Sequence, residues 1–121
     1  MTGVAGLHHV QVAAPPGCEP AARAFYGELL GLPEIEKPLL LAVRGGCWFS
    51  LGEGELHVGV EDPFAPARKA HPAILVEGLS ELASRCAAAG FPPVEDEPLE
   101  GFDRFYVFDP FGNRIELLQR R

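Results

Sequence analysis

The same order of predicted strands and helices occurs twice along this chain of 121 residues. His9 lies in the first strand of one half, and His71 lies in the first strand of the other, about half a chain later. In each half an amphipathic helix follows and ends at a Gly-X-Pro sequence, either Gly31-Leu-Pro33 or Gly90-Phe-Pro92. The repeat predicts a single α+β domain over 1–121. It is expected to contain two βαβββ modules in a pseudo-twofold arrangement, with curled mixed sheets around a cavity.

Alternation of polar and apolar residues, together with β-forming side chains, predicts the strands. They are expected over 7–13, 39–43, 47–51, 55–60 and 71–77, and in a hairpin over 105–118. Helices are expected over 19–30 and over 80–89, the second with Ser80 as its N-cap. A polar connector that contains prolines, over 61–70, separates module one (about 5–61) from module two (about 71–121).

The hairpin near the C-terminus has the clearest turn signal. Asp109-Pro110 favours a tight turn, and Gly112-Asn113 supplies residues that tolerate a positive φ. In the strand that follows, alternation places Glu116 on the same face as Arg114. A carboxylate in the middle of a strand is either solvated or functional, and the histidines in earlier strands favour a function.

Composition excludes several classes of partner. The net charge of −7, from 17 acidic and 10 basic residues, argues against binding to nucleic acid or to an anionic membrane. No apolar run is long enough to cross a bilayer, and residues 1–6 lack the pattern of a signal peptide. The three cysteines are not closely spaced, which fits buried thiols in a cytoplasmic protein.

Three segments carry a resemblance to a known family. They are Leu7-His-His-Val-Gln-Val12, Ala24-Phe-Tyr-Gly-Glu-Leu-Leu-Gly-Leu-Pro33 and Phe105-Tyr-Val-Phe-Asp-Pro-Phe-Gly-Asn-Arg-Ile-Glu-Leu117. In this order the chain resembles the vicinal oxygen chelate superfamily. That superfamily includes glyoxalase I, bleomycin-resistance proteins, fosfomycin-modifying thiol transferases and extradiol dioxygenases. The fold hosts many activities, so the resemblance alone does not select one.

The resemblance implies a divalent metal ion held by His9, His71 and Glu116. Two imidazoles and a carboxylate suit iron, manganese, nickel or zinc and leave coordination positions open for a substrate. A fourth ligand is expected from the segment 55–60, where Glu55 and His57 share one face. The spacing within the repeat favours Glu55, whereas the ligand preference of these metals favours His57; both remain open from the sequence.

Polar residues on the same strand faces are candidates for contact with a substrate. Tyr106 is expected to hydrogen-bond a substrate oxygen, and Arg104 is expected to offset its negative charge. Gln11 points the same way as His9, and Glu55 is a substrate-contacting residue if it is not a ligand.

Together these features predict a small metal-dependent enzyme whose small-molecule substrate chelates the metal through neighbouring oxygens. Lyase or isomerase chemistry of the glyoxalase kind is favoured, with Glu116 and Tyr106 as catalytic residues. The alternatives are a non-catalytic binding protein of the bleomycin-resistance type, and a small extradiol dioxygenase or thiol transferase. The resemblance also implies a homodimer, in which one site takes a module from each subunit.

Overall fold

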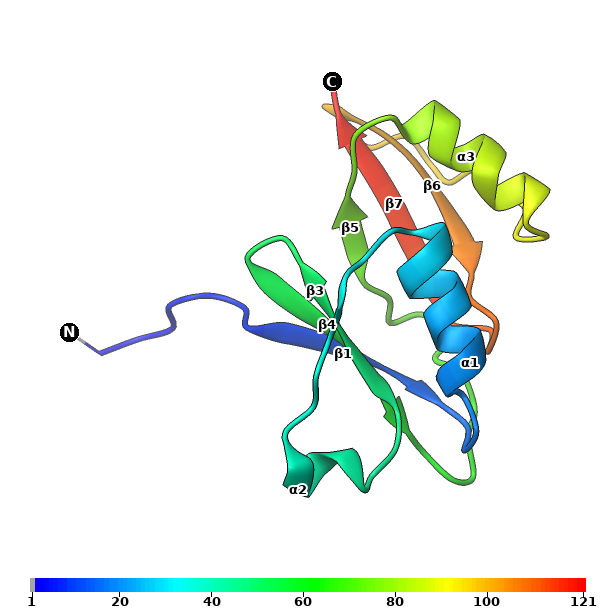
Figure 1. Cartoon of the computed structure of the whole chain (residues 1–121). Coiled ribbons are helices and arrows are strands. Elements are labelled where there is room, and N and C mark those ends of the chain that lie inside the picture. The colour runs from blue at the N-terminus through cyan, green and yellow to red at the C-terminus, as the bar shows by residue number, and fades with distance from the viewer. Residues whose placement is uncertain (1) are drawn as a thin grey trace. The chain divides into compact units, whose positions relative to one another are not determined.

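The computed structural model describes residues 2–121, and the chain divides into two compact units. The first unit extends to Phe64 and the second begins at Ala65. Each unit contains one sheet with both parallel and antiparallel strand pairs, and a helix connects the first strand of the sheet to the rest (Figure 1). The predicted α+β fold is therefore confirmed.

The first unit contains a sheet of four strands. Its elements are β1 (His9–Ala14), α1 (Glu19–Ala22), η1 (Arg23–Leu29), β2 (Glu34–Ile35), α2 (Leu39–Ala42), β3 (Cys47–Leu51) and β4 (Gly54–Val60). The strand order is β1-β4-β3-β2. β1 and β4 are parallel, and the other neighbours are antiparallel. Buried apolar residues of β3 and β4 form its core with the helix.

The predicted helix over 19–30 is present, but its second part is wider than an α-helix. α1 continues directly into η1, a π-helical segment in which the N–H of Leu30 donates to the carbonyl of Phe25 at 3.0 Å. Phe25 and Tyr26 are both fully buried, and the wider turn accommodates these two consecutive aromatic rings on the inner side. Gly31 has φ +77°, the conformation expected of a residue that ends a helix.

The strand predicted over 39–43 is wrong. Leu39–Ala42 form the short helix α2, and the N–H groups of Leu41 and Ala42 both donate to the carbonyl of Pro38 at 2.9 Å. A short apolar run fits either structure, and leucine has no β-branch to favour a strand. Leu39 and Leu40 are 84% and 88% exposed, so no packing on a sheet overrides this local preference. The edge strand next to β3 is instead β2.

The second unit repeats this topology. Its elements are β5 (Ala73–Leu75), α3 (Leu79–Ala88), β6 (Phe102–Phe108) and β7 (Arg114–Arg120). The strand order is β5-β7-β6, with β5 and β7 parallel and β6 and β7 antiparallel. An isolated bridge between Val94 and Tyr106 stands where β2 pairs in the first unit. Leu82 and Cys86 of α3 are buried, and α3 contacts β6 and β7.

Ser80 is not the N-cap of α3, contrary to the prediction. The helix begins at Leu79, and the N-cap is Gly78 in the left-handed conformation (φ 69°, ψ 44°). The N–H of Leu79 donates to the side-chain oxygen of Gln119 on β7 at 2.8 Å. A side chain 40 residues away therefore performs the capping that a serine would perform locally.

The two sheets have the same register as well as the same strand order. One row of residues crosses the first sheet and an equivalent row crosses the second. The first row is Gln11, His57, Trp48 and Ile35; the second is Ala73, Glu116, Tyr106 and Val94. When His9 is matched to His71, Gln11 and Ala73 each lie two residues further along, and their partners His57 and Glu116 hold the same register position.

Among residues 2–121, no helix combines the length and the apolar character needed to cross a membrane.

The turn between β6 and β7 depends on Asp109, which is buried. Its carboxylate accepts hydrogen bonds from the N–H groups of Phe111 (2.9 Å) and Asn113 (2.8 Å) and from the side-chain amide of Asn113 (3.0 Å). Gly112 has φ +92° as predicted, but Asn113 does not have a positive φ. The expected Asp109-Pro110 turn is therefore an Asx-type turn held by the aspartate side chain.

Replacement of Asp109 by alanine should destabilise the chain by about 3 kcal/mol, because each of the three lost hydrogen bonds contributes about 1 kcal/mol. Urea unfolding of Asp109→Ala and of wild type measures the difference in the free energy of unfolding. Asp103→Ala is the control, since Asp103 is exposed on β6 and pairs only with Arg121 among the ion pairs of residues 2–121. Equal stability of the two variants would contradict this role for Asp109.

Candidate metal and substrate site

His71 and Glu116 form the most complete donor pair in the second unit. The Nε2 atom of His71 lies 3.0 Å from Oε1 of Glu116, although the two residues are 45 positions apart in the sequence. The side chain of Glu116 is only 7% exposed because it lies in β7, the middle strand of its sheet. Pro72 connects the pair to the sheet, since its carbonyl accepts a hydrogen bond from the N–H of Glu116.

The hydrogen bonds of His71 fit a metal ligand. Its Nδ1 atom lies 2.8 Å from the carbonyl oxygen of Lys69, which can only accept, so Nδ1 carries the hydrogen. If Nδ1 carries the only hydrogen of the ring, the lone pair on Nε2 is directed at the carboxylate oxygen of Glu116. Two acceptors in contact need a shared proton or a cation between them. A backbone carbonyl on the second ring nitrogen is also the usual partner of a histidine that binds a metal.

The predicted residues of the first unit lie together in a stack of rings. The His57 ring stacks on the Trp48 ring, with centroids 3.9 Å apart and planes at 2°. The His9 ring stacks on the other histidine, with centroids 4.1 Å apart and planes at 17°. Nε2 of His57 is also 2.8 Å from Oε1 of Glu55, and this hydrogen bond lowers the pKa of the Glu55 carboxyl. His57 is buried, whereas His9 is exposed.

The imidazole nitrogens of the stack are suitable ligands for a metal ion. The two imidazoles can bind the same ion only if one of the rings rotates. The lone pairs of His9 and His57 lie in nearly parallel ring planes, so they do not converge on one point. The exposed ring of His9 also contacts His8, with the two Nδ1 atoms 2.9 Å apart, so a rotation of this ring would break that contact. Within residues 2–121 as they stand, no group of three or more His, Cys, Asp or Glu side chains is close enough to hold an ion. Imidazole and carboxylate are nevertheless suitable ligand types for a metal ion, and the His71–Glu116 pair is the arrangement that fits one most closely.

The candidate substrate residues lie beside these donors. Gln11 is the cross-strand neighbour of His57, and its side chain lies against Gly59, where a Cβ atom would approach it to 2.7 Å. Tyr106 is the cross-strand neighbour of Glu116. Arg104 extends to Glu116, with Nη1 3.2 Å from Oε1. The sequence therefore identified groups that the sheets bring side by side within each unit.

Two further residues belong to the cluster around Glu116 and were given no role from the sequence. Nη2 of Arg114 is 2.6 Å from Oδ2 of Asp96, and Nη1 of Arg104 is 3.4 Å from the same oxygen. The pKa of Asp96 is held below its usual range, first by the N–H of Glu97 and then by the two guanidinium groups. Alternation had placed Arg114 on the face of Glu116, but no local pattern marks Asp96, which lies in an irregular loop.

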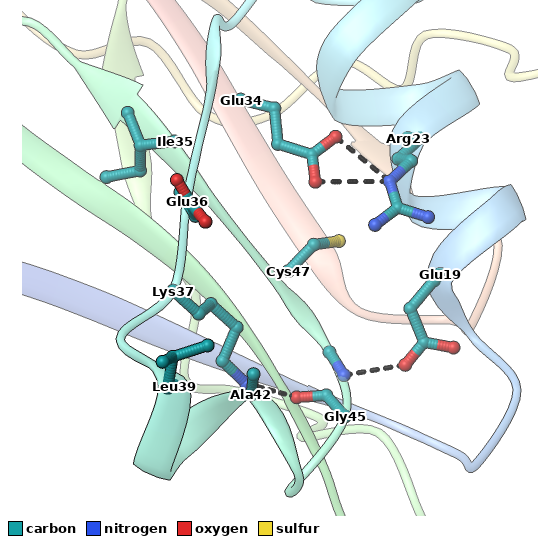
Figure 2. Close-up of a pocket in the computed structure, with 11 residues that line it drawn as sticks. Glu19, Arg23, Glu34, Ile35, Glu36, Lys37, Leu39, Ala42, Gly45 and Cys47 are labelled. Atoms are coloured by element: carbon teal, nitrogen blue, oxygen red, sulfur yellow. Dashed lines mark hydrogen bonds and ion pairs between the residues drawn. The ribbon is translucent and has the colours of Figure 1, made fainter.

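A separate pocket of about 420 Å³ opens in the first unit between η1, β2 and α2 (Figure 2). Most of its charged side chains already have partners. Nε of Arg23 donates to the carboxylate of Glu34 at 2.9 Å, and Lys37 donates to the carbonyl of Gly45. Cys47 lies at its base, and burial raises the pKa of that thiol to about 11, so it is protonated at neutral pH. These contacts support a structural role for the pocket walls.

Similarity to known proteins agrees with this arrangement. The model of the Glyoxalase/Bleomycin resistance protein/Dioxygenase superfamily matches residues 6–117. A solved structure of a glyoxalase family protein from Bacillus anthracis is 49% identical, with a TM-score of 0.94, and the match covers 100% of this chain and 99% of that chain. No curated protein matches the chain.

Two more distant structures share the fold. Lactoylglutathione lyase from Agrobacterium tumefaciens is 20% identical, with a TM-score of 0.74 over 98% of this chain and 96% of that one. The fosfomycin resistance protein FosX from Listeria monocytogenes is 17% identical, with a TM-score of 0.74 over 98% and 94%. At these identities the similarity concerns the fold and carries no substrate to this chain.

The pocket wall gives a prediction for the dependence of stability on pH. The N–H of Gly46 donates to Glu19 at 2.6 Å and holds the pKa of the Glu19 carboxyl below 4.5. Because the folded-state pKa is lowered, the stabilisation is present above pH 4.5 and is lost as the pH falls through the folded-state pKa. Glu19→Gln should therefore reduce the free energy of unfolding by about 1 kcal/mol at neutral pH and by much less once the pH has fallen below the folded-state pKa.

Urea unfolding across this pH range measures the effect. Glu36→Gln is the matched control, because Glu36 lines the same pocket but is exposed. A difference between Glu19→Gln and wild type that stays constant with pH would show that the charge of Glu19 is unimportant.

Proposed function

We propose that this chain, which belongs to the Glyoxalase/Bleomycin resistance protein/Dioxygenase superfamily, is a small metal-dependent enzyme of the vicinal oxygen chelate type. The observation that carries the proposal is the contact between His71 and Glu116. The Nε2 atom of His71 and the Oε1 atom of Glu116 face each other at 3.0 Å, and the second ring nitrogen is fixed by a backbone carbonyl. A divalent cation satisfies both groups.

In this proposal the ligands are His71 and Glu116 from the second unit and His9 and His57 from the first. His57 is preferred over Glu55 because it holds the register position equivalent to Glu116. Glu55 then acts on the metal indirectly, through its hydrogen bond to His57. The two pairs combine in one site, either within a chain or between the two chains of a homodimer.

The reaction we propose is a lyase or isomerase reaction on a substrate with two neighbouring oxygens. When bound, iron, manganese, nickel or zinc supplies Lewis acidity at those oxygens. Glu116, once released from the metal, would take a proton from one of the two carbons that carry these oxygens and return it to the other. The hydroxyl of Tyr106 donates to a substrate oxygen, Arg104 offsets the charge that develops there, and Gln11 contacts the substrate beside His57.

A second candidate is non-catalytic binding of a planar molecule, of the bleomycin-resistance type. The stacked rings of Trp48, His57 and His9 favour it, because they form a flat aromatic surface in the first unit. Binding of a planar ligand without turnover, and without metal, would support this candidate. Oxygenation and thiol transfer remain further alternatives for the same ligand set.

Metal content tests the first candidate. We expect about one zinc, iron, manganese or nickel ion per chain after gentle purification, and less than about a tenth of that in His71→Ala and Glu116→Gln, because each variant removes a direct ligand. Elemental analysis makes the measurement. Glu36→Gln is the control, since Glu36 is exposed and lines the separate pocket of the first unit. Equal metal in wild type and in all three variants would contradict the assignment.

A second pair of variants separates His57 from Glu55. His57→Ala should weaken metal affinity by more than about a hundredfold, whereas Glu55→Gln should weaken it by about tenfold, the effect of losing a group that orients a ligand. Competition with a coloured chelator measures both affinities. If Glu55→Gln has the larger effect, Glu55 is the ligand and the register argument is wrong.

A further inference from the structure

Two guanidinium groups in the second unit converge on one carboxylate oxygen. Oδ2 of Asp96 is 2.6 Å from Nη2 of Arg114 and 3.4 Å from Nη1 of Arg104. Arg104 comes from β6 and Arg114 from β7, so the sheet fixes the positions of both. Asp96 comes from the irregular segment 95–101, in which the neighbouring residues are exposed. The rigid partner is thus the arginine pair, and the carboxylate is supplied by a loop.

Each arginine is held so that it faces this oxygen. The guanidinium of Arg114 lies over the Tyr106 ring, 4.1 Å from its centroid. Nε and Nη2 of Arg104 both donate to the carbonyl of Glu97, at 3.1 Å and 2.5 Å. The side chain of Arg104 is 16% exposed and that of Arg114 is 19% exposed, so both charges lie mostly out of water. Preorganised and desolvated guanidinium groups are a typical site for a carboxylate.

One donor of this pair has no acceptor. Nε of Arg114 is buried, and no hydrogen-bond partner for it exists among the residues that the structure describes. A buried donor on a charged group is costly to leave unpaired, at about 1–3 kcal/mol. Asp96 satisfies Nη2 alone, because its second oxygen, Oδ1, accepts from the N–H of Glu97 at 2.8 Å. A carboxylate brought by a ligand is able to satisfy both Nε and Nη2, the fork arrangement that arginine favours.

The charges of the cluster balance only while no cation is bound. Arg104 and Arg114 are positive, and Asp96 and Glu116 are negative. Arg104 contacts the same Oε1 atom of Glu116 that faces His71. A divalent cation at Glu116 takes over that oxygen and leaves the cluster with two excess positive charges. An anionic group on the substrate offsets part of this excess.

We propose that Arg104 and Arg114 form a carboxylate-binding subsite, which Asp96 occupies in the absence of substrate. The substrate class is then a carboxylate-bearing molecule whose two chelating oxygens are separate from the carboxylate. The substrate displaces the side chain of Asp96, while the carbonyl of Glu97 continues to hold Arg104. This inference rests on the proposed function for the chelating oxygens, but the arginine subsite itself does not require the metal.

A matched pair of probes tests the subsite. 3,4-Dihydroxybenzoate and 3,4-dihydroxybenzamide have the same shape and the same neighbouring hydroxyls, and they differ in charge. NMR titration of the full chain, both metal-free and with added zinc, gives the dissociation constant of each. We expect the acid to bind about tenfold more tightly than the amide in both states, the difference that one charge-assisted contact supplies.

Variants on the two sides of the subsite should act in opposite directions. Arg114→Met should remove the preference for the acid. Asp96→Asn should tighten binding of the acid by about tenfold and leave the amide unchanged, because an internal competitor is neutralised. Asp96→Asn changes no volume, so it keeps the test decisive if Arg114→Met does not fold. Arg121→Met and Asp103→Asn are the controls, since they remove the exposed ion pair between Arg121 and Asp103.

The outcomes separate this inference from the proposed function. Equal binding of acid and amide by wild type overturns the subsite, even if metal content is normal. Weaker binding of the acid by Asp96→Asn also overturns it, because Asp96 then positions the arginines and does not compete with the ligand. A preference for the acid that is lost in Arg114→Met, in a protein that binds no metal, supports the subsite and rejects the proposed enzyme.

Discussion

Each half of this chain depends on one pair of parallel strands with a fixed register. Parallel neighbours need a long crossover, which explains why a helix and further strands lie between β1 and β4, and again between β5 and β7. The same register in both halves places an ionisable residue, His57 or Glu116, in an inner strand next to an aromatic residue, Trp48 or Tyr106. A shift of one residue in either pairing would turn that ionisable side chain to the opposite face. Because His57 and Glu116 are buried, each needs a hydrogen-bond partner.

The sequence predicted the fold well wherever local pattern and tertiary packing agree. The alternation over 55–60 is preserved in β4, and the apolar run 47–51 is β3. Prediction failed where the local signal fits two structures or where the partner is distant. The apolar run 39–43 fits a helix as well as a strand. Because its leucines are exposed, packing on the sheet does not select a strand, and helix propensity after Pro38 produces a short helix. Ser80 is a good N-cap by type, but Gln119, from β7, supplies the cap.

Part of the candidate site could also be predicted. The repeat and the strand alternation marked His71 and Glu116, the resemblance to the vicinal oxygen chelate superfamily implied that they belong to one site, and the structure brings them into contact. The choice between Glu55 and His57 could not be made from the sequence, because turn lengths differ between the halves; strand register supplies the argument for His57. The role proposed for Asp96 has no sequence signal. It depends on a loop conformation and on an ion pair between residues far apart in the chain, and neither leaves a periodic pattern.

The most direct test of the account is a crystal structure of the zinc-loaded protein with anomalous data collected at the zinc edge. The account predicts one strong peak per chain, coordinated by His71 and Glu116 together with His9 and His57, from the same chain or from a second copy. Arg104 is expected to have left Glu116 in that structure. A peak bound elsewhere, for example at the cysteines, or a fully loaded protein in which Glu116 still contacts only His71 and Arg104, would contradict the central claim.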